Sequence, residues 1–113
     1  MDANNNWVIT QMEVKPKEEK LVDVVIFVHW KRNASLIYGD KTYYSAIYGT
    51  MSCEKPSETD FTAYSNLTFE QVCEWLEAGL DVSELDATLD VQLKNQVNPP
   101  IITLPLPFKN PAN

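Results

Sequence analysis

The chain has 113 residues, of which 44% are hydrophobic and 22% are charged, so its composition is that of one globular domain (residues 1–113) and not of a disordered segment. The formal net charge is -7, and residues 61–113 hold seven acidic but only two basic residues. Because phosphate binding requires clustered Lys and Arg, this charge argues against nucleic acid and against an anionic membrane as direct partners.

The N-terminal segment 1–6 has no basic region and no apolar stretch, so we do not expect a signal peptide, and we expect this segment to be flexible. The longest apolar run, Val24–Val28, is too short to span a membrane. The cysteines, Cys53 and Cys73, lie far apart in the sequence and favour two buried free thiols, although a disulfide between them remains an alternative.

The first predicted strand is Trp7–Val14. Under the two-residue period of a strand, one of its faces carries Val8, Thr10, Met12 and Val14. The charged stretch 15–20, which contains Pro16, is expected to end the strand.

The second predicted strand is Leu21–Tyr38, whose first half is apolar on both faces, which indicates a central strand covered on two sides. Gly39-Asp40 predicts a tight hairpin turn, because glycine adopts the positive φ that such turns need. The return strand is Lys41–Cys53. Gly49 in its interior indicates a bulge or a close backbone approach.

A loop, Glu54–Asn66, is expected to lead to a helix over Thr68–Gly79. Thr68 is its predicted N-cap, and Gln71 completes a capping box. The predicted buried face carries Phe69, Val72, Trp75, Leu76 and Gly79. Glu70, Glu74 and Glu77 lie opposite, as a solvated acidic face or as a surface that meets a basic partner.

A second helix is expected over Ser83–Val97, with Ser83 near its start and Asp86 three residues later. Its apolar stripe consists of Leu85, Leu89, Leu93 and Val97. Asp90 and Lys94 have the spacing of a helix ion pair. Pro99-Pro100 is expected to stop the helix.

The residues after this helix, 98–113, form the segment that we call the C-terminal arm. Its prolines favour an extended conformation, and it is too apolar for a free disordered end. The arm either folds back on the chain's own helices or docks on a neighbouring subunit. The candidate partner-binding residues are Ile101, Ile102, Leu104, Leu106 and Phe108 in the arm and Glu70, Glu74 and Glu77 on the first helix.

No pattern in the sequence indicates catalysis. His29 is the only histidine, and the three glycines are too far apart for a phosphate-binding loop. No group of His or Cys has the spacing of metal ligands, so we expect no metal and no cofactor. The expected role is contact with other proteins, and an enzyme is the least favoured reading.

Five short segments together resemble a family of small uncharacterised bacteriophage proteins found in phages of marine and cyanobacterial hosts. They are Trp7–Met12, His29-Trp30, Tyr48–Thr50, Leu67–Val72 and Asn98–Pro100. The resemblance implies a phage origin and assigns no activity to any residue. This chain continues as Phe108–Asn113, where similar proteins end soon after the proline-aromatic step.

We therefore expect an α+β fold: a three-stranded antiparallel sheet packed against two C-terminal helices, with an extended Pro-rich C-terminal arm. The expected function is a phage structural or accessory protein of the virion, such as a head-decoration or tail-associated component, with other virion proteins or a second copy as partner. The alternative is a non-virion phage effector that binds and inhibits a host protein, for which its acidic helix face is the candidate surface. The expected location is the virion, or the host cytoplasm during infection.

Overall fold

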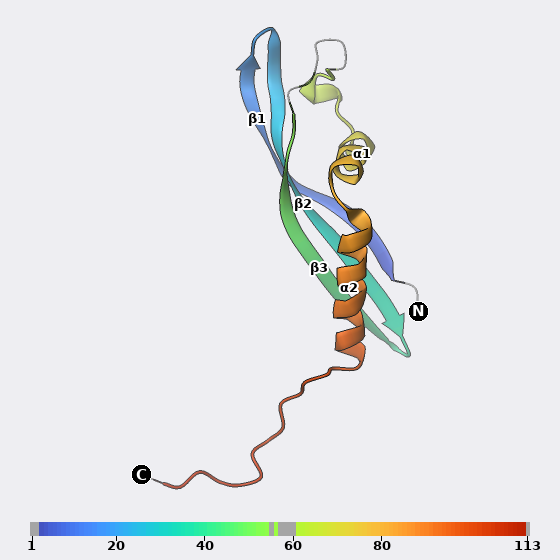
Figure 1. The fold of residues 1–113 in the computed structure, drawn as a ribbon, viewed down its shortest axis with the longest axis vertical. Coiled ribbons are helices and arrows are strands. Elements are labelled where there is room, and N and C mark those ends of the chain that lie inside the picture. Colours follow the sequence, from blue (N-terminus) through green and yellow to red (C-terminus); the bar gives the residue numbers. More distant parts are fainter. Residues whose placement is uncertain (1–2, 55, 57–60, 113) are drawn as a thin grey trace.

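The structure, a computed structural model, describes residues 3–54, 56 and 61–112. Its elements are β1 (Asn4–Glu18), β2 (Leu21–Tyr38), β3 (Lys41–Ser52), the 3-10 turn η1 (Tyr64–Asn66), α1 (Phe69–Gly79) and α2 (Val82–Val97). The strands form one antiparallel sheet in the order β1-β2-β3, and both helices lie along it (Figure 1). The predicted α+β fold, with a three-stranded sheet packed against two C-terminal helices, is confirmed.

β1 extends beyond the predicted strand Trp7–Val14 at both ends. Asn4 already pairs with β2, so the segment 1–6, which we expected to be flexible, joins the sheet from residue 4 onward. Pro16 does not end the strand, because β1 lies at the edge of the sheet and its missing N–H does not interrupt a ladder on both sides. The turn into β2 follows at Glu19, which has a φ of 55°.

The predicted hairpin at Gly39-Asp40 is confirmed, and Gly39 has a φ of 67°. β3 ends at Ser52, one residue before the predicted end. Gly49 marks a close approach, since a Cβ atom at this position would lie 2.3 Å from the Trp30 ring. Gly49 therefore allows the Trp30 indole to lie across β3.

Two register shifts in the β1–β2 pairing exchange the faces of these strands along their length. Thr10 in β1 has no partner in β2, and Ile26 in β2 has none in β1. An unpaired residue of this kind moves the following side chains to the opposite face. Met12 consequently joins Ile9 in the core. The single face predicted for Val8, Thr10, Met12 and Val14 is therefore wrong, because only Met12 and Val14, after the bulge, lie on the core face.

Only one face of β2 is covered by helices. From Val28 to Leu36, every second residue is buried. The residues between them are polar and partly exposed: His29, Lys31, Asn33 and Ser35. We call this side of the sheet the open face. The prediction that the central strand is covered on two sides is wrong, because these polar side chains replace the apolar ones that a second layer would require.

α1 begins at the predicted cap. The Gln71 backbone N–H donates to Thr68 Oγ1 at 3.2 Å. The Gln71 side chain does not complete the capping box, because its Nε2 donates instead to Thr62 Oγ1 at 3.0 Å and so ties the preceding loop to the helix. Val72 is buried as predicted, but Phe69 is 54% exposed, so its predicted place on the buried face is wrong.

α2 begins at Val82, one residue before the predicted start near Ser83. Its N-cap is Asp81, whose Oδ1 accepts a hydrogen bond from the Glu84 backbone N–H at 3.1 Å. The start predicted near Ser83 is therefore confirmed to within one residue, with Asp81 as the N-cap. Asp86, which the pattern assigned to the start of this helix, binds Arg32 of β2 instead.

The remainder of α2 follows the sequence pattern. Leu89 and Leu93 are fully buried against the sheet, and Lys94 Nζ lies 2.8 Å from Asp90 Oδ2. The Gln96 side chain reaches the edge of the sheet, where its Nε2 donates to the Tyr44 carbonyl oxygen at 2.6 Å. The helix ends at Val97, before the two prolines, as predicted.

The core between sheet and helices consists of two clusters. The cluster under α1 contains Trp7, Val25, Val28, Trp30, Val72 and Leu76, and the cluster under α2 contains Ala34, Leu36, Leu89 and Leu93. Trp7 and Trp30 meet edge to face, with ring centroids 5.6 Å apart. Their indole N–H groups are buried without a hydrogen-bond partner within the described residues, so this pair stabilises the fold by packing.

We predict that Gly49→Ala lowers the free energy of unfolding by about 1–3 kcal/mol, because the new methyl group meets the Trp30 ring inside a packed core. Urea unfolding followed by tryptophan fluorescence measures this loss. Gly79→Ala is the matched control, since its methyl group meets only the flexible end of Met51 and alanine is favoured over glycine in a helix by up to about 1 kcal/mol. Equal losses in both variants would contradict this account of Gly49.

Candidate protein interaction site

The C-terminal arm, of which the structure describes residues 98–112, contains no helix and no strand. Figure 1 shows it leaving the end of α2 and running away from the sheet and from α1. Five large apolar side chains in it are between 61% and 87% exposed: Ile101, Ile102, Leu104, Leu106 and Phe108. In this structure the arm does not fold back on the chain's own helices, which was one of the two predicted arrangements.

The three predicted glutamates do lie together. Glu70, Glu74 and Glu77 line one groove between α1 and the sheet, with a volume of about 470 Å³. Its other lining residues are Asn5, Asn6, Trp7, Arg32, Phe69 and Cys73. We call it the acidic groove. It combines negative charge with the exposed ring of Phe69, which the sequence pattern had assigned to the core.

Arg32 forms the inner wall of the acidic groove and is only 9% exposed. Its Nε and its second guanidinium nitrogen donate to the two carboxylate oxygens of Asp86 at 3.0 and 3.2 Å. Its guanidinium carbon also lies 4.6 Å from the centre of the Trp7 ring. One buried cation therefore joins the edge strand, the central strand and α2.

The hydrogen bond from Arg32 holds the pKa of Asp86 below its usual value. Partial burial of the carboxylate acts in the opposite direction, and a hydrogen bond from the Asn5 side chain lowers the pKa further. The carboxylate is therefore ionised at neutral pH. The sequence did not reveal this pair, because its members are 54 residues apart and belong to different kinds of element.

The two cysteines are free thiols, as the sequence favoured over a disulfide, but they are only partly buried. Burial raises the pKa of both thiols. The pKa of Cys73 is raised further by Glu77 and Glu70, and Arg32 partly opposes this effect. Both thiols are therefore protonated at neutral pH, which does not favour a role as a nucleophile.

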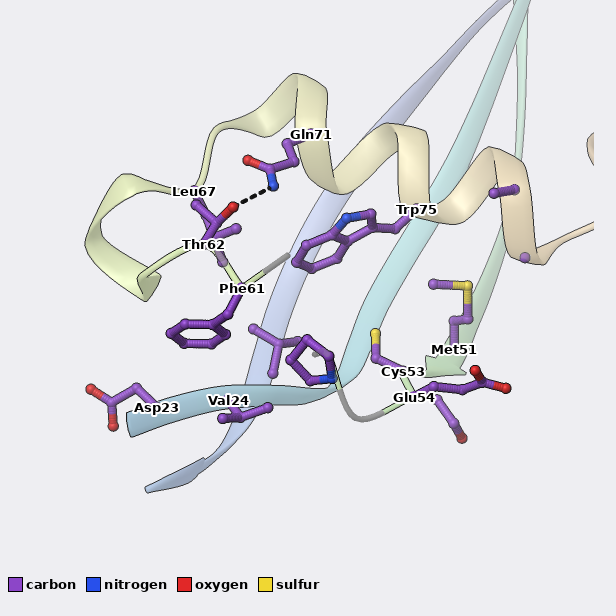
Figure 2. Close-up of a pocket in the computed structure, with 15 residues that line it drawn as sticks. Asp23, Val24, Met51, Cys53, Glu54, Phe61, Thr62, Leu67, Gln71 and Trp75 are labelled. Atoms are coloured by element: carbon purple, nitrogen blue, oxygen red, sulfur yellow. Dashed lines mark hydrogen bonds between the residues drawn. The ribbon is translucent and has the colours of Figure 1, made fainter. Parts of the chain in front are cut away.

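A second cavity lies between α1 and the ends of β2 and β3 and has a volume of about 540 Å³, within the range of about 300–1,000 Å³ that ligand pockets have. Figure 2 shows the rings of Phe61 and Trp75 and the sulfur atoms of Met51 and Cys53 around it. Its lining also includes Val24, Val25, Pro56, Leu67 and Ala78. We call it the apolar pocket. Sequence patterns did not indicate it, because its residues come from several separate segments.

Carboxylates and other polar groups stand at the margin of the apolar pocket. Asp23 and Glu54 contribute to its lining and are exposed to solvent. Thr62 and Gln71 are joined by a hydrogen bond along one side, which fixes the loop against α1 (Figure 2). The pocket thus has an apolar interior and an acidic rim, and Cys53 contributes the one thiol in its lining.

His29 lies between Glu13 and Thr50 in a row of three side chains across the open face. The sequence did not indicate this row, because His29 is the only histidine. Its Nε2 lies 2.5 Å from Glu13 Oε1, and its Nδ1 lies 2.9 Å from Thr50 Oγ1. A catalytic triad would have the same three groups. Here, however, the row crosses three paired strands, and none of the three residues lines the acidic groove or the apolar pocket. The geometry favours a cross-strand bridge.

Within residues 3–54, 56 and 61–112, no group of three or more His, Cys, Asp or Glu residues has an arrangement that holds a metal ion. No helix in the same part of the chain is both long and apolar enough to cross a membrane. The surfaces that stand out are therefore the C-terminal arm, the acidic groove and the apolar pocket.

Comparison with known proteins adds a family but no activity. Residues 2–108 match a family defined by a domain of unknown function, DUF7936. The matched region includes the apolar residues of the C-terminal arm as far as Phe108. No curated protein and no solved structure matches the chain. Function must therefore be inferred from the surfaces of this molecule.

We predict that Asp86→Asn lowers the free energy of unfolding by about 1–2 kcal/mol at pH 7, because it removes the charged partner of buried Arg32 while solvent screens a side chain that is 34% exposed. Since the pKa of Asp86 is lower in the folded state, this stabilisation is present above the unfolded pKa of about 4 and is lost as the pH falls through the folded pKa.

Urea unfolding of both proteins between pH 7 and pH 2 measures the difference, which should shrink toward zero at the acidic end. Asp90→Asn is the control, because its exposed pair with Lys94 is worth only about 0.3–0.5 kcal/mol. A difference between Asp86→Asn and the unmodified chain that does not change with pH would contradict the role given to the ion pair.

Proposed function

We propose that this chain, which belongs to the DUF7936 family, is a phage structural or accessory protein that acts by protein–protein contact, as a head-decoration or tail-associated component of the virion. The observation that carries the proposal is the C-terminal arm. It presents five large apolar side chains to solvent, next to one another and away from the chain's own core. Contiguous exposed apolar surface of this kind is typical of a site that binds another protein.

The energetics of the arm favour contact over a free end. Complete burial of a large apolar side chain contributes about 1.5–3 kcal/mol, so five of them exceed the low end of the association cost of about 4–15 kcal/mol. A single residue would not be enough. The arm therefore works as a unit, and its prolines reduce the conformational freedom that binding must remove.

The phage origin is supported by the resemblance of Trp7–Met12, Leu67–Val72 and Asn98–Pro100, among other segments, to small phage proteins. A virion component must also persist among densely packed neighbours. The shape of this molecule suits that setting, because it is elongated, 72 × 42 × 21 Å including the arm that projects from one end.

Mass spectrometry of purified particles of the phage that encodes this chain tests the proposal. We expect the chain in the particles at a constant ratio to the major structural proteins. A phage whose copy of the chain ends after Pro100 should assemble particles that lack it, because the arm makes the contact while the core residues are all retained. Absence of the full-length chain from washed particles would overturn the virion role.

The acidic groove favours a second candidate, a non-virion effector that binds a host protein. The exposed Phe69 ring stands beside Glu70, Glu74 and Glu77, so charge that attracts a basic surface is combined with an apolar anchor. In this role the groove would imitate a polyanion toward a host protein that normally binds one.

A pull-down from host lysate with the full chain tests this second candidate. We expect the variant Glu70→Gln, Glu74→Gln, Glu77→Gln to lose a partner that the unmodified chain captures and releases at high salt. Replacement of the exposed Glu84 by Gln, outside the groove, is the control and should leave capture unchanged. Capture that is insensitive to both salt and the triple substitution would contradict the effector role.

A further inference from the structure

We propose that the C-terminal arm of one copy of this chain occupies the apolar pocket of a second copy. This inference rests on the contact role proposed above and names both the partner and the site that receives the arm. It follows from two features that the structure leaves without a counterpart in the same molecule: an exposed apolar segment and an apolar cavity.

The chemistry of the arm and the pocket is complementary. The pocket presents Phe61, Trp75 and Met51 around a volume of about 540 Å³, which holds a few large side chains but not a protein domain. The arm offers a narrow chain with apolar residues at every second position from Ile102 to Phe108. In an extended chain such alternate residues project to the same side, so consecutive ones enter one cavity together.

The charges agree with this arrangement. Lys109 is the one charged side chain of the C-terminal arm and directly follows its last large apolar residue. The rim of the pocket carries the carboxylates of Asp23 and Glu54. When the apolar residues of the arm lie in the pocket, Lys109 therefore reaches its acidic rim. The net charge of the whole chain is also strongly negative, which attracts a cationic segment from a distance.

The length of the arm favours the pocket of a second copy over its own. The pocket ends at Gly79, before α2 begins, and the arm starts after α2. A chain returning from Asn98 must therefore retrace the 16 residues of α2, a length of about 24 Å. Leu104 lies six residues beyond Asn98 and reaches only about 20 Å when fully extended. Ile101, Ile102 and Leu104 thus cannot reach the pocket of their own molecule, so the whole apolar row can be bound only by a second copy.

Each copy carries both an arm and a pocket, so exchange between two copies is possible in two ways. A reciprocal exchange closes as a two-fold dimer, whereas a one-way exchange continues from copy to copy as a ring or a chain of subunits. Removal of the arm leaves the fold intact, because both core clusters lie between Trp7 and Leu93 and the arm residues are exposed.

The thiol of Cys53 in the pocket tests the proposal, and the thiol of Cys73 in the acidic groove is an internal control. The reaction rate of each thiol with a small disulfide reagent is measured for the full chain and for a chain ending after Pro100. At a total chain concentration about 100 times the dissociation constant, about a tenth of the pockets stay open, so we expect Cys53 to react about tenfold more slowly in the full chain, and Cys73 equally in both. A peptide of residues 99–113 should restore the protection in the shortened chain.

A cross-link identifies the partner. In a chain carrying Leu106→Cys and Cys73→Ser, mild oxidation should join Cys53 of one copy to the new cysteine of another, which gives dimers or larger species on a non-reducing gel. The same chain with Cys53→Ser should give none through this position. Light scattering should show a mass above the 12.9 kDa of one chain, and the mass of one chain after truncation.

Equal reactivity of Cys53 in both proteins, with a monomeric full chain, would overturn the arm exchange. An intramolecular disulfide in the cross-linking variant would overturn it as well, by placing the arm in its own pocket. Neither result bears on the virion role, which the mass spectrometry of purified particles tests separately. Conversely, arm exchange in solution together with absence from particles keeps this inference and removes only the virion role.

Discussion

The guanidinium of Arg32 is the point at which the two layers of this protein are fixed to each other. It rests against the Trp7 ring of the edge strand and binds both carboxylate oxygens of Asp86 in α2. A buried cation without such partners costs several kcal/mol, so the position of α2 along the sheet is restricted to the one that supplies the carboxylate. The direction in which the C-terminal arm leaves α2, and the wall of the acidic groove, both depend on this restriction.

Local patterns accounted for much of the fold. The Gly39-Asp40 turn, the Thr68 cap, the stripe of Leu89 and Leu93 and the end of α2 are each determined by residues close in sequence. The three glutamates also share one side of α1, as their helical spacing indicated, although the groove that this side lines was not predicted. Where the rule is local, a single chain contains the information needed to apply it.

The predictions from the sequence were wrong where the local structure depends on contacts between residues far apart in the chain. The unpaired Thr10 can be recognised only in the register between two strands, and it moved half of β1 to the other face. The sequence pattern assigned Asp86 to the start of a helix, but in the folded chain its carboxylate binds Arg32 of the sheet. The apolar pocket likewise assembles Val24, Cys53 and Trp75 from separate elements. Contacts between such distant residues depend on tertiary structure, so the periodicity of the sequence does not predict them.

The hydrogen bond from Gln96 to the Tyr44 carbonyl has a consequence for the behaviour of the sheet as a whole. A sheet edge is a row of unpaired backbone groups that other strands can join, which leads to edge-to-edge aggregation. At one edge, this side chain occupies a carbonyl of β3. At the other, β1 contains Pro16 and the bulge at Thr10. A long three-stranded sheet can thus remain stable at high local concentration without growing into a fibril.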